Sequence, residues 1–229
     1  GRGVAEHSTT LSRPVDRLRT TLTYVYVMTR GTQEERDAVA RMVNKMHATV
    51  RGQGYTAYDR DLQLWVAATL AHNGIFIHEK VFGPMSLETK EQIYRDSQVF
   101  GTALQVKPED WPPTYADFEK YWDHVLATQL TSEPLVRDYV RALLSSKGQP
   151  WFLRPGAGLQ NLMTKGNLPP EVRDLLGLTW SWREQKLYDL FWSVFAFAYP
   201  VVPRFVRFAH ARLVMRDFRR RMRKGKRVI

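Results

Sequence analysis

The sequence contains no cysteine. This absence excludes disulfide bonds, Cys-ligated zinc, iron–sulfur clusters, covalently attached c-type haem and a cysteine nucleophile. Any metal ion or haem must therefore be held by histidine or by carboxylates. The cellular compartment is not fixed by this observation, because a chain without cysteine tolerates reducing and oxidising surroundings alike.

Long apolar runs and familiar hydrolase motifs are missing as well. The most apolar segment, residues 187–202, is rich in aromatic residues but is interrupted by Asp189 and Pro200. It is too short for a confident membrane-spanning helix, which needs about 20 apolar residues. The sequence has no G-x-S-x-G elbow, and His78-Glu79 is not followed by the second histidine of an H-E-x-x-H zinc motif. Hydrolase chemistry is therefore not favoured.

The basic residues are concentrated at the end of the chain. The 229 residues carry a net charge of +11, but residues 204–229 contain eleven basic residues and one acidic residue. This segment thus holds +10 of the net charge, and residues 1–203 hold only +1. We expect residues 1–203 to form one helical domain and residues 204–229 to form a basic C-terminal extension, either a helix or a tail.

The aromatic segment and the basic segment that follows it allow three interpretations. Aromatic rings followed by arginines are typical of an interfacial membrane anchor, so residues 187–229 are a candidate surface for anionic lipid. A last core helix followed by a solvated basic tail explains the pattern equally well. Nucleic-acid binding is not favoured, because no recognisable nucleic-acid-binding fold precedes the basic segment.

The sequence pattern predicts helices over the body of the chain. We find no convincing alternation of apolar and polar residues between hairpin turns, whereas apolar residues recur with the 3.6-residue period of a helix. Helix starts are expected near Ser12 with Pro14, at Thr32, at Asp59 or Asp61, at Ser86, at Thr114, and at Ser132 with Pro134. We expect residues 147–170, rich in glycine and proline, to form a loop, followed by a short helix from Pro170. The fold class is therefore all-α.

One histidine stands out among six. His47 follows Val43 by four residues and precedes Val50 by three, on the apolar stripe of an expected helix. Imidazole is the only strong nitrogen ligand in this chain. A single histidine on such a stripe is more often a hydrogen-bonded core residue than a metal ligand, so both interpretations stay open.

A second unusual feature is the spacing Arg17-x-x-x-Thr21. Four residues apart on a helix, the two side chains share one face at the edge of an apolar stripe that contains Leu18 and Val25. A guanidinium at such an edge needs an anionic partner. The partner could be a protein carboxylate, a substrate group or a cofactor propionate.

Several motifs together resemble the MpaB-type and rubber-oxygenase (latex-clearing protein) superfamily. The resemblance extends to about Trp182 and depends on the order and spacing of the motifs. They are Gly3-Val-Ala-Glu-His-Ser8, Asp16-Arg17-Leu18 leading to Thr21, Gly31-Thr32, His47-Ala-Thr-Val-Arg-Gly52, Tyr55-x-Ala57, Leu64-Trp-Val-x-Ala-Thr-Leu70, Gly83-Pro-Met-Ser86, Pro112-x-Thr114 and Leu168-Pro-x-x-Val-Arg173.

The resemblance implies an all-helical domain that encloses a noncovalent haem b with one proximal histidine. By this resemblance His47 is the haem iron ligand, and Arg17 and Thr21 are the pair needed beside the haem. The implied activity is that of an oxidoreductase, an oxygenase that uses O₂ to oxidise or cleave a C=C bond in a hydrophobic substrate, such as an isoprenoid. We expect a cytoplasmic protein that associates peripherally with membranes.

The sequence also departs from the family. Rubber oxygenases can have a lysine before the threonine as a sixth iron ligand, whereas this chain has Thr20. Family members usually carry helices before the Gly3 motif, and these are expected to be absent here. Glu6 lies upstream of Arg17, but it does not align with the upstream glutamate that the family uses as a proposed base. The alternative function is a noncatalytic helical module that docks to a membrane or to a protein partner.

Overall fold

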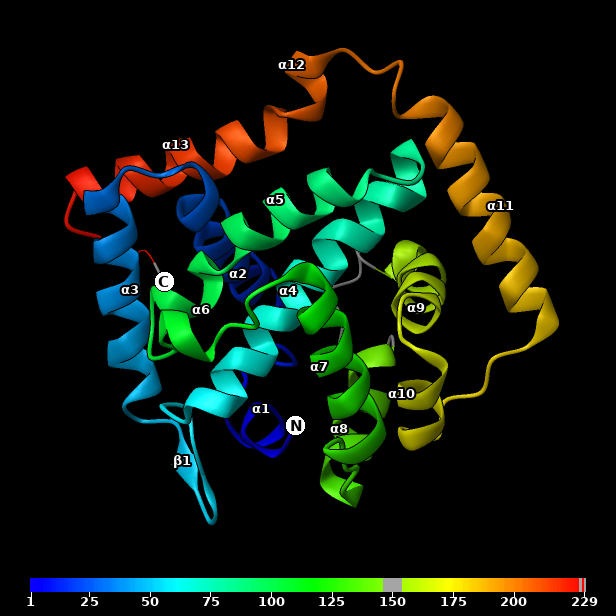
Figure 1. Cartoon of the computed structure of the whole chain (residues 1–229), viewed down its shortest axis with the longest axis horizontal. Helices are drawn as coiled ribbons and strands as arrows, with labels where there is room; N and C mark the ends of the chain where they lie inside the picture. Colours follow the sequence, from blue (N-terminus) through cyan, green and yellow to red (C-terminus); the bar gives the residue numbers. More distant parts are fainter. Residues whose placement is uncertain (146–153, 227, 229) are drawn as a thin grey trace.

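Helices make up most of the computed structural model, which describes residues 1–145, 154–226 and 228 (Figure 1). The prediction of an all-α fold is confirmed. The first half of the chain forms α1 (Arg2–His7), α2 (Pro14–Arg30), α3 (Gln33–His47), α4 (Arg60–Phe82), α5 (Leu87–Ser97) and α6 (Val99–Thr102). The second half forms α7 (Tyr115–Thr128), α8 (Pro134–Leu144), α9 (Ala157–Gly166), α10 (Pro170–Leu175), α11 (Trp182–Ala198), α12 (Arg204–Arg207) and α13 (Ala209–Arg223).

A short hairpin joins α3 to α4. Its strands β1 (Arg51–Gly52) and β2 (Tyr55–Thr56) are antiparallel, with Arg51 opposite Thr56 and Gly52 opposite Tyr55. Gly54 turns the hairpin with a φ of 81°, a conformation that favours glycine. Four strand residues are too few to show the alternating pattern that sequence reasoning looks for.

Most of the expected helix starts are confirmed. The side chains of Thr32, Asp59, Ser86 and Thr114 each accept a hydrogen bond from a backbone N–H in the first turn of the following helix. Two starts differ. Arg13 and Glu133, in place of Ser12 and Ser132, precede α2 and α8, and neither caps its helix with a side chain. Proline at the first helical position, whose φ already suits a helix, begins both of these helices.

The prediction of a loop over residues 147–170 is wrong for its second half. Residues 157–166 form α9, in which Ala157 is buried, and this helix packs against α11. Gly158 and Gly166 fit inside the helix despite their low helix propensity, because tertiary packing outweighs a cost of about 1 kcal/mol per glycine. Residues 147–153 lie outside the described part of the chain.

The main core lies where α2, α3, α4, α5 and α7 meet. Tyr94 of α5 and Phe118 of α7 are completely enclosed, and Val27 of α2 and Val39 of α3 join them. The Tyr94 hydroxyl donates a 2.6 Å hydrogen bond to the carbonyl of Pro112, so the polar end of this buried ring is satisfied. These helices form the support on which the candidate site is built.

The basic segment packs on this core. Helix α13 lies along α2 and buries Ala211, Met215 and Phe218, of which the last two belong to the main hydrophobic cluster. A bidentate ion pair of 2.7 and 3.2 Å joins Arg219 to Glu35 of α3. Helix α13 therefore has one buried face and one cationic face. Arg227, one of the eleven basic residues of this segment, lies outside the described residues.

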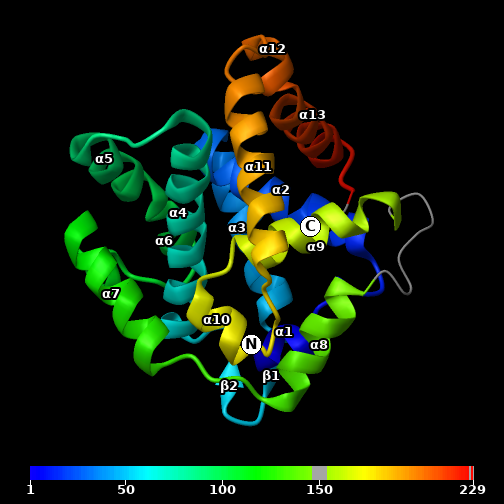
Figure 2. The ribbon, with the colours of Figure 1, turned by 90° about the vertical axis from the view of Figure 1, so that its right-hand side faces the viewer.

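Helix α11 forms the outer edge of a second, smaller cluster around Tyr188 and Trp192, with Val81 of α4. Beyond α11 the chain turns through residues 199–203 into α12, which lies at the extreme edge of the molecule in both views (Figures 1 and 2). Among the described residues, no helix is both long and apolar enough to cross a bilayer.

Candidate functional site

His47 is the last residue of α3, and the end of this helix is fixed by polar contacts. The Tyr58 hydroxyl donates a 2.7 Å hydrogen bond to the carbonyl of Asn44, and the side chain of Asn44 accepts a 2.8 Å hydrogen bond from the Gln105 amide. The carbonyl of His47 accepts a hydrogen bond from the backbone N–H of Val50 at 3.0 Å. These hydrogen bonds, made by residues before and after His47 in the chain, therefore fix the backbone that carries its ring.

The imidazole of His47 has unused bonding capacity. The residue is half-buried, and its Nδ1 atom is shielded from solvent without a hydrogen-bond partner in the described part of the chain. Burial lowers the pKa of His47, and the positive charge of Arg17 lowers it further. Both causes keep the imidazole neutral, which is the form that can bind a metal ion.

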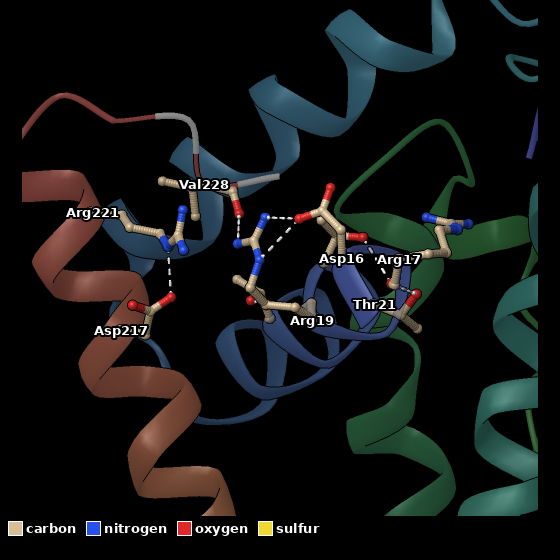
Figure 3. Close-up of polar contacts among 9 residues, drawn as sticks. Asp16, Arg17, Arg19, Thr21, Asp217, Arg221 and Val228 are labelled. Atoms are coloured by element: carbon tan, nitrogen blue, oxygen red, sulfur yellow. Dashed lines mark hydrogen bonds and ion pairs between the residues drawn. The ribbon is translucent and has the colours of Figure 1, made fainter. Parts of the chain in front are cut away.

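Arg17 and Thr21 lie one turn apart on α2, and Figure 3 shows them on one side of that helix. The Thr21 hydroxyl donates a 3.0 Å hydrogen bond to the carbonyl of Arg17. Both side chains are exposed, in contrast to the predicted edge of a buried stripe. Their neighbours Val15 and Leu18 are 56% and 59% exposed, so the stripe itself is open on this part of α2.

The guanidinium of Arg17 has no acidic side chain within ion-pair distance among the residues that the structure describes. Its neighbour Asp16 instead accepts a 2.8 Å hydrogen bond from Arg19, whose other nitrogen donates to the carbonyl of Val228 at 2.6 Å (Figure 3). The carboxylate next to Arg17 is therefore used by another arginine. Arg17 thus remains a cation near His47 with no acidic partner in the described part of the chain.

The structure thus brings Arg17 close enough to His47 to affect its titration, and it places Thr21 beside Arg17. Large apolar side chains are exposed on the three helices around this site. They are Val15 and Leu18 on α2, Met46 on α3, and Leu62 and Val66 on α4.

Three of the motifs that carried the family resemblance meet at Tyr55. A Cβ added to Gly3 or Gly52 would lie 2.9 or 2.5 Å from the Tyr55 ring, so both glycines are needed for close packing. The Tyr55 hydroxyl donates a hydrogen bond to Glu6 and lies 3.0 Å from Nε2 of His7. The hydrogen bond from Tyr55 lowers the pKa of Glu6. Sequence reasoning missed this cluster, although Gly52, three residues before the tyrosine, was a usable signal.

His72 shares two properties with His47. Its Nδ1 atom is also buried without a partner in the described residues, and burial lowers its pKa. Its ring is stacked on Trp122 with centroids 3.8 Å apart and faces Phe76 on the same helix. Aromatic packing therefore accounts for His72, whereas His47 has no comparable ring contact with any residue that the structure describes. Among the described residues, no group of three or more acidic or histidine side chains is placed to hold a bare metal ion.

An apolar groove of about 880 Å³ lies between α9 and α11. Leu159 and Leu162 line one wall, and Leu187, Leu190 and Val194 line the other. Lys165 and Glu184 also line the groove and form an ion pair with each other. The lining of this groove is therefore mainly apolar, with one ion pair.

Comparison with known proteins finds two mycobacterial relatives that match nearly the whole chain. The chain is 36% identical over 222 residues to an uncharacterized protein of Mycobacterium tuberculosis and, to the same extent, to an uncharacterized protein of Mycobacterium bovis. In both cases the match covers 94% of this chain and 87% of the relative. No solved structure matches significantly.

The model of one protein family matches residues 1–198. The match contains all three candidate residues and ends at the last residue of α11, so α12 and α13 lie beyond it. The chain belongs to the family of the ER-bound oxygenases mpaB/B′ and the rubber oxygenases, and it matches their catalytic domain.

Proposed function

We propose that this protein is a haem b-dependent oxygenase in which His47 would hold the haem iron. The observation that carries the proposal is the imidazole of His47, which is half-buried, kept neutral and left with an unpaired buried nitrogen. A haem supplies four ring nitrogens of its own, so a single histidine is enough to hold it. The family of oxygenase catalytic domains supports the same assignment.

Arg17 and Thr21 fit the needs of such a group. Haem b carries two propionates, and the guanidinium of Arg17 is a cation without an acidic partner among the described residues. The Thr21 hydroxyl, which donates to the carbonyl of Arg17, retains lone pairs that can accept a further hydrogen bond. Their roles are therefore to orient the group and to balance its charge.

The apolar side chains exposed on α2, α3 and α4 offer surface that an apolar cofactor or substrate would cover. Leu18 and Val66 are more than half exposed, and covering each of them stabilises the complex by about 1.5–3 kcal/mol. When bound, haem supplies the activation of O₂ and the oxidation of a C=C bond, while the protein supplies orientation and a dry environment. A hydrophobic substrate, such as an isoprenoid, suits these surroundings.

The haem assignment is tested by absorption spectroscopy on protein produced with haem available. We expect a Soret band at about one haem per chain, and we expect His47→Ala to abolish it. His72→Ala and His124→Ala are the matched controls, because the first removes the other shielded imidazole and the second an exposed one. A folded wild-type protein that takes up no haem would refute the proposal, as would loss of haem in His72→Ala with retention in His47→Ala.

A further inference from the structure

The tip formed by the end of α11, the following turn and α12 exposes unusually large apolar side chains. We call residues 197–208 the apex. Phe197 and Val201 are 85% and 80% exposed, more than any other large hydrophobic residue in the described chain, and Phe205 is 66% exposed. Both views place α12 at the outer limit of the molecule (Figures 1 and 2). No other part of the described chain therefore lies beyond the apex to keep it from entering a lipid bilayer.

The apolar surface extends from the apex down α11. Leu190, Val194 and Phe197 follow one another at spacings of four and three residues, which places them along one side of α11, and Val201 lies in the turn that follows the helix. Leu190 and Val194 also line the groove between α9 and α11. The exposed apolar face of α11 thus leads from this groove to the apex.

A cationic surface adjoins the apex. Arg30, Arg212, Arg216, Arg219 and Arg223 line a hollow of about 380 Å³ between α2 and α13. Arg30 connects the two features, because its guanidinium also lies 5.0 Å from the ring centre of Phe208 at the end of the apex. The cations and the exposed apolar side chains therefore occupy neighbouring parts of one surface.

Most of these arginines are not neutralised within the protein. Arg219 is paired with Glu35, but Arg212, Arg216 and Arg223 have no acidic side chain within ion-pair distance in the described chain. Asp217, the only acidic residue after position 203, is already shared by Arg220 and Arg221. Arg212, Arg216 and Arg223 are thus available to an external anionic partner.

We propose that the apex inserts into the interface of an anionic lipid bilayer while the arginines of α13 and Arg30 bind the lipid phosphates. Insertion covers the exposed apolar side chains, and the cations are attracted to the negative surface of the membrane. Charge alone would also suit nucleic acid, but a nucleic-acid backbone offers nothing to cover Val201 and the apolar side of α11. The combination of the two surfaces favours lipid.

The proposal is tested by sedimentation of the full chain with vesicles. The vesicles consist of phosphatidylcholine alone or of phosphatidylcholine with about a third phosphatidylglycerol, which supplies the negative surface. We expect binding to the anionic vesicles only, weakening as the salt concentration rises. A short DNA duplex serves as the competing polyanion.

Two double variants separate the apolar contribution from the electrostatic one. Phe197→Ser with Phe205→Ser is expected to weaken binding about tenfold or more for each phenylalanine that inserts. Arg216→Gln with Arg223→Gln is expected to weaken it about fivefold for each arginine. All of these side chains are exposed, and circular dichroism checks that the fold is retained.

Matched controls lie away from this surface. Trp182→Ser removes a side chain that is 70% exposed at the opposite end of α11, and Arg51→Gln with Lys120→Gln removes two exposed positive charges from β1 and α7. Both controls should bind vesicles like the wild type. The proposal is overturned if the wild type ignores anionic vesicles at low salt or if the apex variant binds as tightly as the wild type. It is also overturned if DNA is bound in preference to the vesicles.

Discussion

Substitution of Phe218 tests whether the basic C-terminal segment is part of the folded core. Phe218 is 1% exposed and belongs to the same hydrophobic cluster as Val27 and Val39. It lies in a segment whose composition alone is equally typical of a solvated tail. If the packing of α13 on α2 is as described, Phe218→Ala opens a cavity between these helices.

The size of the effect follows from the burial. Truncation of a fully buried phenylalanine to alanine costs about 3–5 kcal/mol, because the transfer free energy and the cavity term add. For a domain of this length the melting temperature falls by roughly 2–4 °C per kcal/mol, so the expected loss is roughly 6–20 °C. Phe205→Ala, at the exposed apex, should change the free energy of unfolding by no more than about 0.5 kcal/mol.

The assay is urea unfolding of the full chain, followed by circular dichroism, with thermal unfolding as a second measure. Phe218→Leu is a useful intermediate, since it keeps an apolar side chain in the cavity and should recover part of the loss. A destabilisation below about 1 kcal/mol for Phe218→Ala would refute the packing of α13 on the core, because even a well-relaxed cavity costs more.

Three further expectations concern the site and the backbone. Arg17→Gln should raise the pKa of His47 in an NMR titration, because the positive charge of Arg17 is one of the two causes that lower it. The pKa should stay below the ordinary 6.5, since burial is the larger cause. An unchanged pKa would show that Arg17 does not act on His47. Gly74→Ala should stabilise the protein by about 1 kcal/mol in urea unfolding, because Gly74 lies inside α4 and an added Cβ meets no atom within 4 Å. Gly83→Ala should destabilise it by about 1 kcal/mol or more, because Gly83 has a φ of 85° that alanine adopts only with strain, and a gain in stability would contradict the described turn.

If His47 holds a haem as proposed, the pH dependence of haem retention follows from the same titration. The lowered pKa of His47 means that the folded protein keeps this imidazole neutral at neutral pH. As the pH falls through the lowered pKa, the ring binds a proton and can no longer ligate iron. The Soret band should therefore be stable at neutral pH and be lost in acid, with a midpoint below 6.5, and Arg17→Gln should move this midpoint upward.

Much of the fold could be predicted from local signals. Four capping side chains and the apolar periodicity identified α3, α4, α5 and α7, because these signals act within one or two turns. Helix α9 was missed, since its glycines argue against a helix and only its packing against α11 stabilises it. Sequence reasoning could not tell whether Met215 and Phe218 are buried or belong to a solvated tail. Their burial depends on a partner helix about 190 residues earlier in the chain.

For the candidate site, the sequence predicted how two residues are placed on one helix but not how exposed they are. The spacing placed Arg17 and Thr21 on one face of a helix, and this is what the structure has. Their exposure was not foreseen, because the periodicity of one helix does not say which neighbours cover it. The cluster around Tyr55 was missed for a similar reason, as Glu6 and Gly52 are brought together by the path of the chain between them.

Contacts between the two ends of the chain have a consequence for how this protein is made. The hydrogen bond from Arg19 to the carbonyl of Val228 spans 209 residues, and the contacts of Tyr26 with His210 and of Glu35 with Arg219 each span 184. Contacts so distant in sequence form late, since a large loop must close before they contribute. During synthesis, α2 therefore leaves the ribosome long before the helix that covers it. Until that helix arrives, the apolar face of α2 is open to aggregation, so the nascent chain should depend on chaperones more than a helical bundle with only local contacts does.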